Sequence, residues 1–316
     1  GFAMFTCPPI LPYFTPLPTL SLQGEANLGI PAWLAAVEAD LDKALASGTP
    51  IRQVVMGRCC AIDSMMEALF ELYELDQTDL TLFATGGYGR GELHPFSDVD
   101  LLLLSPNPID EVLNQKISPF AAKLWDIGID PALVVRSVEE CDEACHDDIT
   151  VATSLLEARI LAGNAAQAGL PMQLLNKNWS QTKFYEAKMA EAKERYLKHN
   201  STEYNLEPDL KNAPGGLRDI HTVGWISKRY FRVTNLFGLV QQEFITEKEF
   251  DELQQAEDFL WLIRHHLHKI AKRNENRVLF DYQRLIAERI GYRDNSHPNA
   301  AVEQFMRDYY LSLIHI

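Results

Sequence analysis

Two aspartates separated by one residue, Asp98 and Asp100, could carry chemistry because they enter an apolar run that ends at Leu104. Side chains alternate across a β-strand, so both carboxylates project from one face while Val99 points to the other face, toward the core. Oxygen ligands of this kind suit a hard divalent cation such as Mg²⁺, which proteins often share with substrate phosphates. The pair therefore predicts a metal site at the start of a strand.

A glycine pair, Gly86 and Gly87, ends an earlier run of apolar, β-favouring residues over positions 80–85. Backbone N–H groups of a glycine turn at the start of a helix can hold phosphate oxygens. Together, the turn and the two carboxylates describe a metal-assisted nucleotide site, in which the turn binds phosphates and the aspartates bind the cation.

Two plainer interpretations of these motifs stay open. An Asp-x-Asp pair at a strand end is often a solvated edge, and Gly87, Gly89 and Gly91 also suggest a dinucleotide-binding fold. Their spacing is not Gly-x-Gly-x-x-Gly, however, and Pro95 limits the following helix to roughly two turns, too short for a dinucleotide-binding crossover. The glycine pair followed by Asp-Val-Asp in a second apolar strand is more specific than either motif alone.

The elements that position these residues predict an α+β fold. Apolar, β-favouring runs indicate strands over residues 80–85, 99–104 and 132–135. Helical spacing of apolar residues indicates helices over residues 33–45, 51–75 and 109–127, the last interrupted at Pro119. From Ile149 onward the pattern is helical, with helices expected over residues 149–162, 172–199, 221–237, 246–273 and 283–290. We therefore predict a small mixed sheet backed by helices, followed by an all-helical domain.

The predicted organisation has four parts: a flexible Pro-rich leader over residues 1–24, a sheet domain over 25–148, a helical domain over 149–310, and a truncated or artefactual tail over 311–316. The leader is uncharged up to Glu25 and contains five prolines, so it cannot form a membrane-spanning helix. It also lacks the basic region of a signal peptide. We expect a cytoplasmic protein with no membrane segment.

Charge and cysteine content narrow the class of protein further. The chain has 44 acidic and 29 basic side chains, a formal net charge of −15, which disfavours nucleic acid as a partner. With 47% hydrophobic and 23% charged residues, it has enough apolar side chains for a core. The five cysteines are odd in number and show no disulfide or zinc spacing, so reduced thiols are expected.

The segment GGYGRGELHPFSDVDLLLL, residues 86–104, resembles the signature of the nucleotidyltransferase domain in the PII uridylyltransferase family, bifunctional enzymes that also remove uridylyl groups. Two further segments resemble the same family. NLEPDLKNAPGGLRDIHTVGWI, residues 205–226, is similar to its connecting segment, and FLWLIRHHLHKIAKR, residues 259–273, is similar to its helical region. The resemblance covers residues 51–310 and implies a nucleotidyltransferase core of the DNA polymerase β-like superfamily.

The resemblance implies an enzyme that transfers UMP from UTP to a tyrosine hydroxyl of a PII protein, releasing pyrophosphate, as part of nitrogen and glutamine sensing. It implies that Asp98 and Asp100 bind Mg²⁺, with Mn²⁺ as a substitute. It also implies that the backbone of Gly86 and Gly87 holds phosphate oxygens. Two alternatives remain, transfer to a small-molecule hydroxyl and a nucleotide-binding regulatory pseudoenzyme; the intact glycines and aspartates argue against the second.

Three more residues receive roles from the resemblance. Members of the superfamily place a third carboxylate on the following strand, and Asp130 is expected there as a metal ligand or a base, although it could simply open the strand before Pro131. Arg90 and Ser97 are expected to contact the nucleotide, with a structural salt bridge as the alternative for Arg90. The turn over residues 214–216 either closes over the nucleotide or only joins two helical layers.

The uridylyl-removing activity of this family requires an HD-type set of metal ligands. The chain has one His-Asp dipeptide, His146-Asp147, outside the expected region, so we expect the hydrolase domain to be absent from this chain. The clustered His265, His266 and His268 are expected to be solvated or packed.

Overall fold

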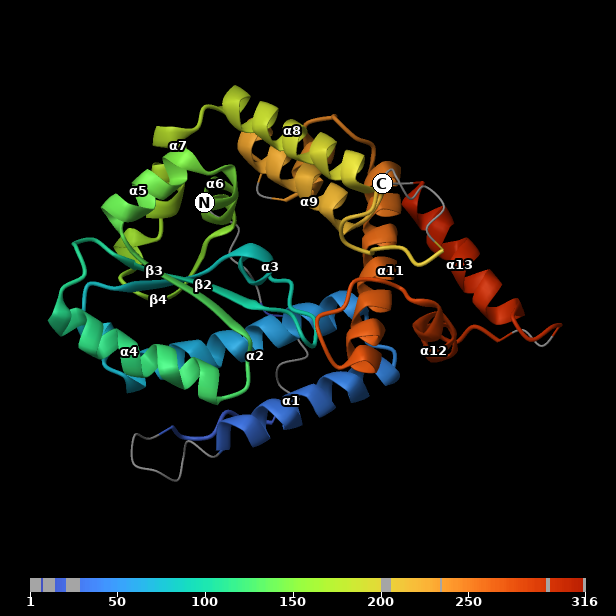
Figure 1. The fold of residues 1–316 in the computed structure, drawn as a ribbon, viewed down its shortest axis with the longest axis horizontal. Coiled ribbons are helices and arrows are strands. Elements are labelled where there is room, and N and C mark those ends of the chain that lie inside the picture. The colour runs from blue at the N-terminus through green and yellow to red at the C-terminus, as the bar shows by residue number, and fades with distance from the viewer. Residues whose placement is uncertain are drawn as a thin grey trace. The chain divides into compact units, whose positions relative to one another are not determined.

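The computed structural model describes residues 7, 15–20, 29–199, 206–233, 235–293 and 296–314. The described residues fall into two compact units, which are considered separately. The sheet unit takes in the described residues up to Leu93 together with Ser97–Trp179, and the helical unit takes in His94–Phe96 and the described residues from Ser180 onward. Figure 1 shows the strands of the first unit and the long helices of the second.

Four strands of the sheet unit form one mixed sheet in the order β3-β2-β1-β4. Strand β1 pairs antiparallel with β2 and β4, while β2 and β3 are parallel. The bounds of the strands are β1 Thr81–Ala84, β2 Val99–Ser105, β3 Pro131–Ser137 and β4 Arg159–Gly163. All four residues of β1 are buried, as expected for a central strand covered on both faces. The prediction of a small mixed sheet backed by helices is confirmed.

Helices α2 (Ile51–Leu72) and α4 (Glu111–Asp126) run along one face of the sheet (Figure 1). They meet at Phe70 and Phe120, whose ring centroids lie 6.5 Å apart in an edge-to-face arrangement. Pro119 was expected to interrupt α4, but the helix continues through it. The buried side of α4, which includes Phe120, is therefore a continuous packing surface in spite of the lost backbone donor.

Strand β4 was wrongly predicted as part of a helix over residues 149–162. The structure has helix α6 (Ile149–Glu157), which ends before the strand begins at Arg159. Pairing with β1 gives this apolar segment its conformation, because Ile160 and Ala162 take register with Phe83 and Leu82. The sheet unit consequently extends to Trp179, well beyond the boundary expected after residue 148.

The N-terminal helix α1 (Gly29–Ala46) is contacted by part of the predicted leader. Thr15 donates from its backbone N–H and its hydroxyl to Asp40 Oδ2, at 2.9 and 3.0 Å, and accepts a bond from Trp33 Nε1 at 2.9 Å. These contacts join Thr15, within the predicted leader, to α1. The rest of the leader, apart from Cys7 and residues 15–20, lies outside the described residues.

The prediction of reduced cysteines is wrong for one pair. Cys7 and Cys60, which lie 53 positions apart, form a disulfide that joins the N-terminal segment to α2, whereas Cys59, Cys141 and Cys145 are free and buried. Cysteine spacing could not reveal this pair, because the fold sets the approach of two such distant residues. Cys141 and Cys145 lie on helix α5 (Val138–Asp147).

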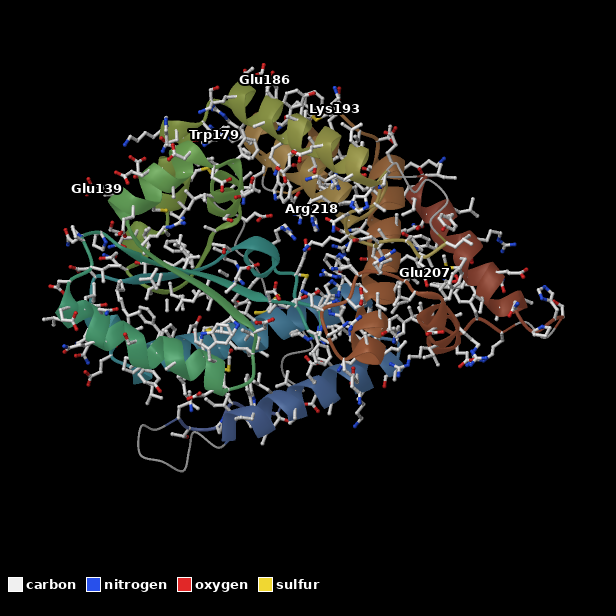
Figure 2. All side chains as sticks on the ribbon, in the orientation of Figure 1. Glu139, Trp179, Glu186, Lys193, Glu207 and Arg218 are labelled. Carbon is white, nitrogen blue, oxygen red and sulfur yellow. A yellow bond between two sulfur atoms is a disulfide. The ribbon has the colours of Figure 1, made fainter. Side chains whose placement is uncertain are left out.

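The expected helix over residues 172–199 is two helices, α7 (Leu170–Asn178) and α8 (Gln181–His199). The helical conformation is interrupted at Trp179, which is labelled in Figure 2. Its indole Nε1 donates to the backbone oxygen of Cys145 at 2.6 Å. Ser180 then starts α8 by accepting a bond from the Lys183 N–H. The break separates the last helix of the sheet unit from the first long helix of the helical unit.

The remaining elements of the helical unit are helical. They are α9 (Leu217–Ile226), a π-helix over Ser227–Phe231, α10 (Phe237–Gln241), α11 (Glu247–Ala271), α12 (Phe280–Ile290) and α13 (Ala300–Leu313). Short α3 (Gly86–Gly89) and the 3₁₀ turns Leu75–Gln77 and Ala165–Gln167 belong to the sheet unit. Residues 311–313, expected as part of a tail, continue α13. None of the described helices is both long and apolar enough to cross a membrane.

Candidate active site

The paired aspartates stand at the entrance of β2, where alternation along the strand was expected to place them. Val99 is buried, whereas Asp98 is exposed and Asp100 is half-buried. The two carboxylates therefore flank a residue that anchors the strand in the core. Anchoring of this kind fixes the spacing of the two carboxylates, which are of the chemical type that divalent cations prefer.

Gly86 lies directly against one of these carboxylates. Its φ of +54° is in the left-handed region, and a Cβ built on it would lie 2.3 Å from Asp100 Oδ2. The neighbouring Thr85 N–H donates to the backbone oxygen of Asp100 at 3.0 Å. Only glycine fits this position, because any side chain would displace the carboxylate and strain the backbone. The conformational requirement falls on Gly86; Gly87 has no positive φ.

The backbone N–H groups of the glycine turn differ from its carbonyls in their hydrogen bonding. Among the described residues, no backbone hydrogen bond uses the N–H of Gly86 or Gly87 as its donor, and Thr85 makes no side-chain cap at the start of α3. The carbonyls of the turn are engaged, since Gly86 O accepts from Arg90 N and Gly87 O accepts from Glu92 N. The turn is thus held through its oxygens, while the N–H groups of Gly86 and Gly87 are the first two of α3, a position from which backbone donors can bind an anion.

Asp130 lies at the same end of the sheet as the aspartate pair. It directly precedes β3, its backbone oxygen accepts from Val99 N at 2.8 Å, and Val99 takes register with Pro131. Its side chain is exposed. Within the described part of the chain, however, no three acidic, histidine or cysteine side chains converge into a metal-binding group. Asp130 therefore shares the sheet end with the pair without forming a three-ligand cluster with it.

Arg90 forms salt bridges, which was the alternative to its predicted contact with the nucleotide. Its guanidinium bonds both oxygens of Glu92, at 3.1 and 3.2 Å, and Glu157 Oε1. Burial alone would lower the pKa of Arg90, but the carboxylates of Glu157 and Glu92 raise it above its usual value. The arginine thus links the glycine turn to the end of α6. Ser97, the other expected nucleotide contact, is half-buried next to Asp98.

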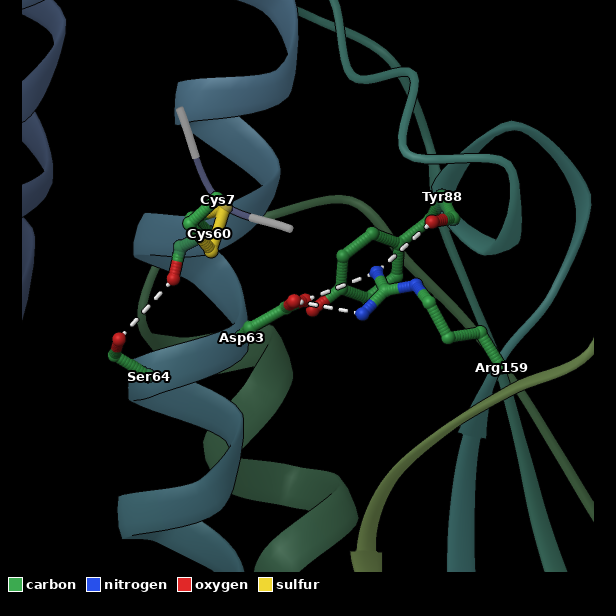
Figure 3. The surroundings of a disulfide bond; sticks show 6 residues. All are labelled: Cys7, Cys60, Asp63, Ser64, Tyr88 and Arg159. Atoms are coloured by element: carbon green, nitrogen blue, oxygen red, sulfur yellow. Dashed lines mark hydrogen bonds and ion pairs between the residues drawn. A yellow bond between two sulfur atoms is a disulfide. The ribbon is translucent and has the colours of Figure 1, made fainter. Parts of the chain in front are cut away.

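A second arginine braces the same turn from β4 (Figure 3). Arg159 donates to both oxygens of Asp63 on α2, at 2.7 and 3.1 Å, and to the backbone oxygen of Tyr88 at 3.2 Å. Its guanidinium lies 5.4 Å from the centre of the Tyr88 ring. Burial, followed by the negative charge of Asp63, raises the pKa of Tyr88 well above its usual value, so the phenol stays neutral. We call Asp63, Tyr88 and Arg159 the turn clasp.

The turn clasp was missed by sequence reasoning. Asp63 follows four apolar residues of α2, so its charge was a usable signal, but nothing local connects it to Arg159, 96 positions later. Glu157 and Arg159 were placed in a helix, where they would not face the glycine turn.

The turn over residues 214–216 in the helical unit has a different character. Gly215 N donates to Asp219 Oδ2 at 2.7 Å, Gly216 N to Ala213 O at 2.8 Å, Leu217 N to Leu210 O at 2.9 Å, and Arg218 N to Lys211 O at 2.8 Å. Arg218, labelled in Figure 2, lies in the first turn of α9. Because every backbone donor at this helix start has a partner within the unit, the geometry favours the view that the turn joins helical layers.

Two of the three clustered histidines of α11 lie in the core of the helical unit, and His266 is half-buried. His265 and His268 are buried, and the His268 Nδ1 accepts from Phe96 N at 3.3 Å. They are packed, which was one of the two expected states. His146 lies in the last turn of α5 in the sheet unit.

Family models match the two parts of the chain separately. The model described as a nucleotidyltransferase domain matches residues 65–154, which include the glycine turn and all three aspartates. The model described as GlnD PII-uridylyltransferase matches residues 183–316. The second match begins within α8 and includes residues 311–316, which had been set apart as a tail.

Curated proteins that the chain is similar to are described as bifunctional uridylyltransferase/uridylyl-removing enzymes. The one from Psychrobacter sp. (strain PRwf-1) is 58% identical, and the one from Psychrobacter arcticus is 54% identical, each over 97% of this chain and 35% of the relative. The one from Acinetobacter baumannii is 49% identical over 88% of this chain and 32% of the relative. The chain thus spans about a third of the length of these relatives.

Proposed function

We propose that this chain, which belongs to the PII uridylyltransferase family, transfers UMP from UTP to a tyrosine hydroxyl of a PII protein and releases pyrophosphate. The contact between Gly86 and the Asp100 carboxylate carries the proposal. It supports the proposal because it joins a glycine turn, to which we assign phosphate binding, to a carboxylate, to which we assign cation binding, and nucleotidyl transfer requires both in one place.

The residues present fit a divalent metal ion. Asp98 and Asp100 offer hard oxygen ligands beside a glycine that leaves room for a neighbouring group, so we assign them to Mg²⁺, or to Mn²⁺ in its place. A bound metal would neutralise charge on the triphosphate and help to orient it. We assign the backbone N–H groups of Gly86 and Gly87 to the phosphate oxygens, and Ser97 to the same nucleotide site.

In the proposed reaction, the tyrosine oxygen forms a bond to the α-phosphorus of UTP and the bond from that phosphorus to the β-phosphate bridging oxygen breaks. Pyrophosphate leaves and the hydroxyl proton passes to a base. We assign that role to Asp130, which is exposed at the same sheet end as the aspartate pair. Arg90 and the turn clasp hold the turn in position during this step.

The experiment that tests the proposal uses the four ribonucleoside triphosphates, each labelled at its α-phosphate, with a purified PII protein and Mg²⁺. We expect label from UTP on a PII tyrosine, and no label when the metal is chelated. Asp98→Asn should abolish labelling, whereas Asp126→Asn, an exposed carboxylate at the end of α4, should not. Labelling of a small hydroxyl compound in place of PII, or no labelling with any nucleotide, would refute the proposal.

A further inference from the structure

Four aromatic side chains lie in a continuous row on the helical unit. The ring centroids of Tyr185 and Tyr230 are 6.4 Å apart, those of Tyr230 and Phe231 are 5.2 Å apart, and those of Phe231 and Phe244 are 4.3 Å apart. The row joins α8, the π-helix and the segment before α11. We call these four residues the aromatic patch.

Three of the four side chains in the aromatic patch are exposed, and Phe231 is half-buried. Tyr185 is 42% exposed, Tyr230 is 49% exposed and Phe244 is 56% exposed. A single exposed ring is common on protein surfaces, but rings that touch each other in a row form a contiguous apolar surface of the kind that marks interaction sites. Tyrosine is also enriched among residues that dominate binding energy at protein interfaces.

The backbone that carries Tyr230 and Phe231 has an unusual conformation, and side chains hydrogen-bond to it. Tyr230 and Phe231 belong to a π-helix, a rare conformation that occurs often at functional sites. Gln181 Nε2 donates to the Tyr230 backbone oxygen at 3.4 Å, and Gln242 Nε2 donates to that of Phe231 at the same distance. Arg232 ends the element with φ +56°, a strained value for a residue other than glycine. The fold thus keeps a costly conformation that presents these rings.

Positive charge accompanies the patch. Lys228, Arg229 and Arg232 lie within five residues of one another, with no acidic residue among them, on a chain whose net charge is −15. Burial and the nearby charge of Arg232 lower the pKa of Arg229. We call these three residues the basic rim. Arg232 is exposed next to Phe231 in the chain, whereas Lys228 and Arg229 are half-buried. On a chain of net negative charge, such a local positive charge favours an acidic partner at this face.

We propose that the aromatic patch and the basic rim dock the acceptor protein through a surface of apolar side chains flanked by carboxylates. The inference rests on the proposed function, since it takes the acceptor to be a PII protein. A folded protein substrate needs a contact area beyond the reacting tyrosine, because a single side chain cannot supply specific affinity. The aromatic patch would supply the apolar anchor and the basic rim the charge complementarity.

Direct binding of the full chain to a fluorescently labelled PII protein tests the docking without the reaction. Phe244→Ser and Arg232→Glu should each raise the dissociation constant at least about tenfold, the scale of an interface anchor. In the transfer assay the same variants should raise KM for PII by a similar factor and leave KM for UTP unchanged. Matched controls on α12 are Phe280→Ser, which is also 56% exposed, and Arg284→Glu; both should bind like the wild type.

Binding and transfer separate the two proposals. Wild-type binding that Phe244→Ser and Arg232→Glu weaken, with no transfer of UMP, would support the docking surface while refuting the proposed reaction. Transfer with unchanged binding in both variants would refute the docking surface alone. If the variants instead abolish self-association of the chain, or binding to vesicles of anionic lipid, the surface has another occupant and the inference is wrong.

Discussion

Two glycine turns in this chain lie at helix starts: Gly86-Gly87 are the first two residues of α3, and Gly215-Gly216 directly precede α9. In the first, the carbonyls are bonded and no described backbone bond uses the glycine N–H groups as donors; in the second, each of these N–H groups has an acceptor. A carboxylate lies beside each turn, but Asp219 accepts from Gly215 N, whereas Asp100 contacts the Cα side of Gly86. An aspartate beside a glycine turn thus bonds the turn's backbone in one case and packs against the glycine in the other.

The difference distinguishes a scaffold from a candidate ligand site. Buried backbone donors are normally satisfied, so a turn whose donors are all bonded has completed its structural role. The first turn differs because, among the described residues, no backbone bond uses its glycine N–H groups as donors, which is why we propose it as the phosphate site. Glycine is required in the second turn because a Cβ on Gly216 would lie 2.8 Å from two backbone oxygens, those of Ala213 and Leu210.

The largest effect should come from exchanging each carboxylate for its amide. Asp100→Asn keeps the shape of the side chain but removes a metal-binding charge, so we expect kcat to fall at least about a hundredfold with the melting temperature unchanged. Asp219→Asn should instead lower stability and leave kcat nearly unchanged. It weakens the acceptor of Gly215 N and the partner of Arg195, and should lower the free energy of unfolding by about 1–3 kcal/mol while kcat changes less than about threefold.

Thermal unfolding and steady-state transfer kinetics on both variants provide the measurement. The comparison fails if Asp100→Asn retains near-normal Mg²⁺-dependent activity. It also fails if Asp219→Asn, at full folding, loses activity as severely as Asp100→Asn does.

A smaller contrast is expected between the glycines themselves. In Gly86→Ala the new Cβ would displace the Asp100 carboxylate, so kcat/KM for UTP should fall at least about tenfold. In Gly216→Ala the clash is with backbone that cannot move away, and unfolding should become easier by about 2 kcal/mol or more, with kcat per folded molecule preserved. Equal losses of activity in the two variants, at equal stability, would contradict the assignment of separate roles.

The parts that the sequence predicted well are those encoded by local pattern. Strands β1 and β2 follow from apolar runs on either side of the glycine turn, and alternation alone places Asp98 and Asp100 around buried Val99. Helices α2 and α11 follow from long apolar periodicity. The candidate site lies within one short segment, so its main residues were accessible without knowledge of the fold.

The missed parts depend on contacts between distant segments. Strand β4 is an apolar run that continues from a helix, and only pairing with β1 distinguishes it. The bonds of Arg90 to Glu157 and of Arg159 to Asp63 span 67 and 96 positions, respectively, so no local sequence pattern predicts them. The break between α7 and α8 did have a local signal, since Ser180 is a good helix cap, but the surrounding helical periodicity obscured it.

The smallest effect concerns the support of the first turn. Arg159→Lys keeps the positive charge but cannot bond both oxygens of Asp63 and the Tyr88 carbonyl together, because a lysine lacks the planar fork of the guanidinium. The turn should become less well positioned, so we expect KM for UTP to rise about three- to tenfold, with kcat at saturating UTP reduced less than about twofold.

Arg58→Lys is the matched control for this substitution. Arg58 also bonds both oxygens of one carboxylate, that of Glu38, and one backbone oxygen, that of Leu93, so its loss should cost similar stability. It lies on α2 like Asp63 but bonds no residue of the glycine turn, and KM for UTP should therefore stay at the wild-type value. If Arg159→Lys and Arg58→Lys shift KM equally, the loss is one of general stability; if neither shifts it, the turn keeps its shape without the turn clasp. Only a rise confined to Arg159→Lys agrees with a turn that binds phosphates through donors held in place from β4.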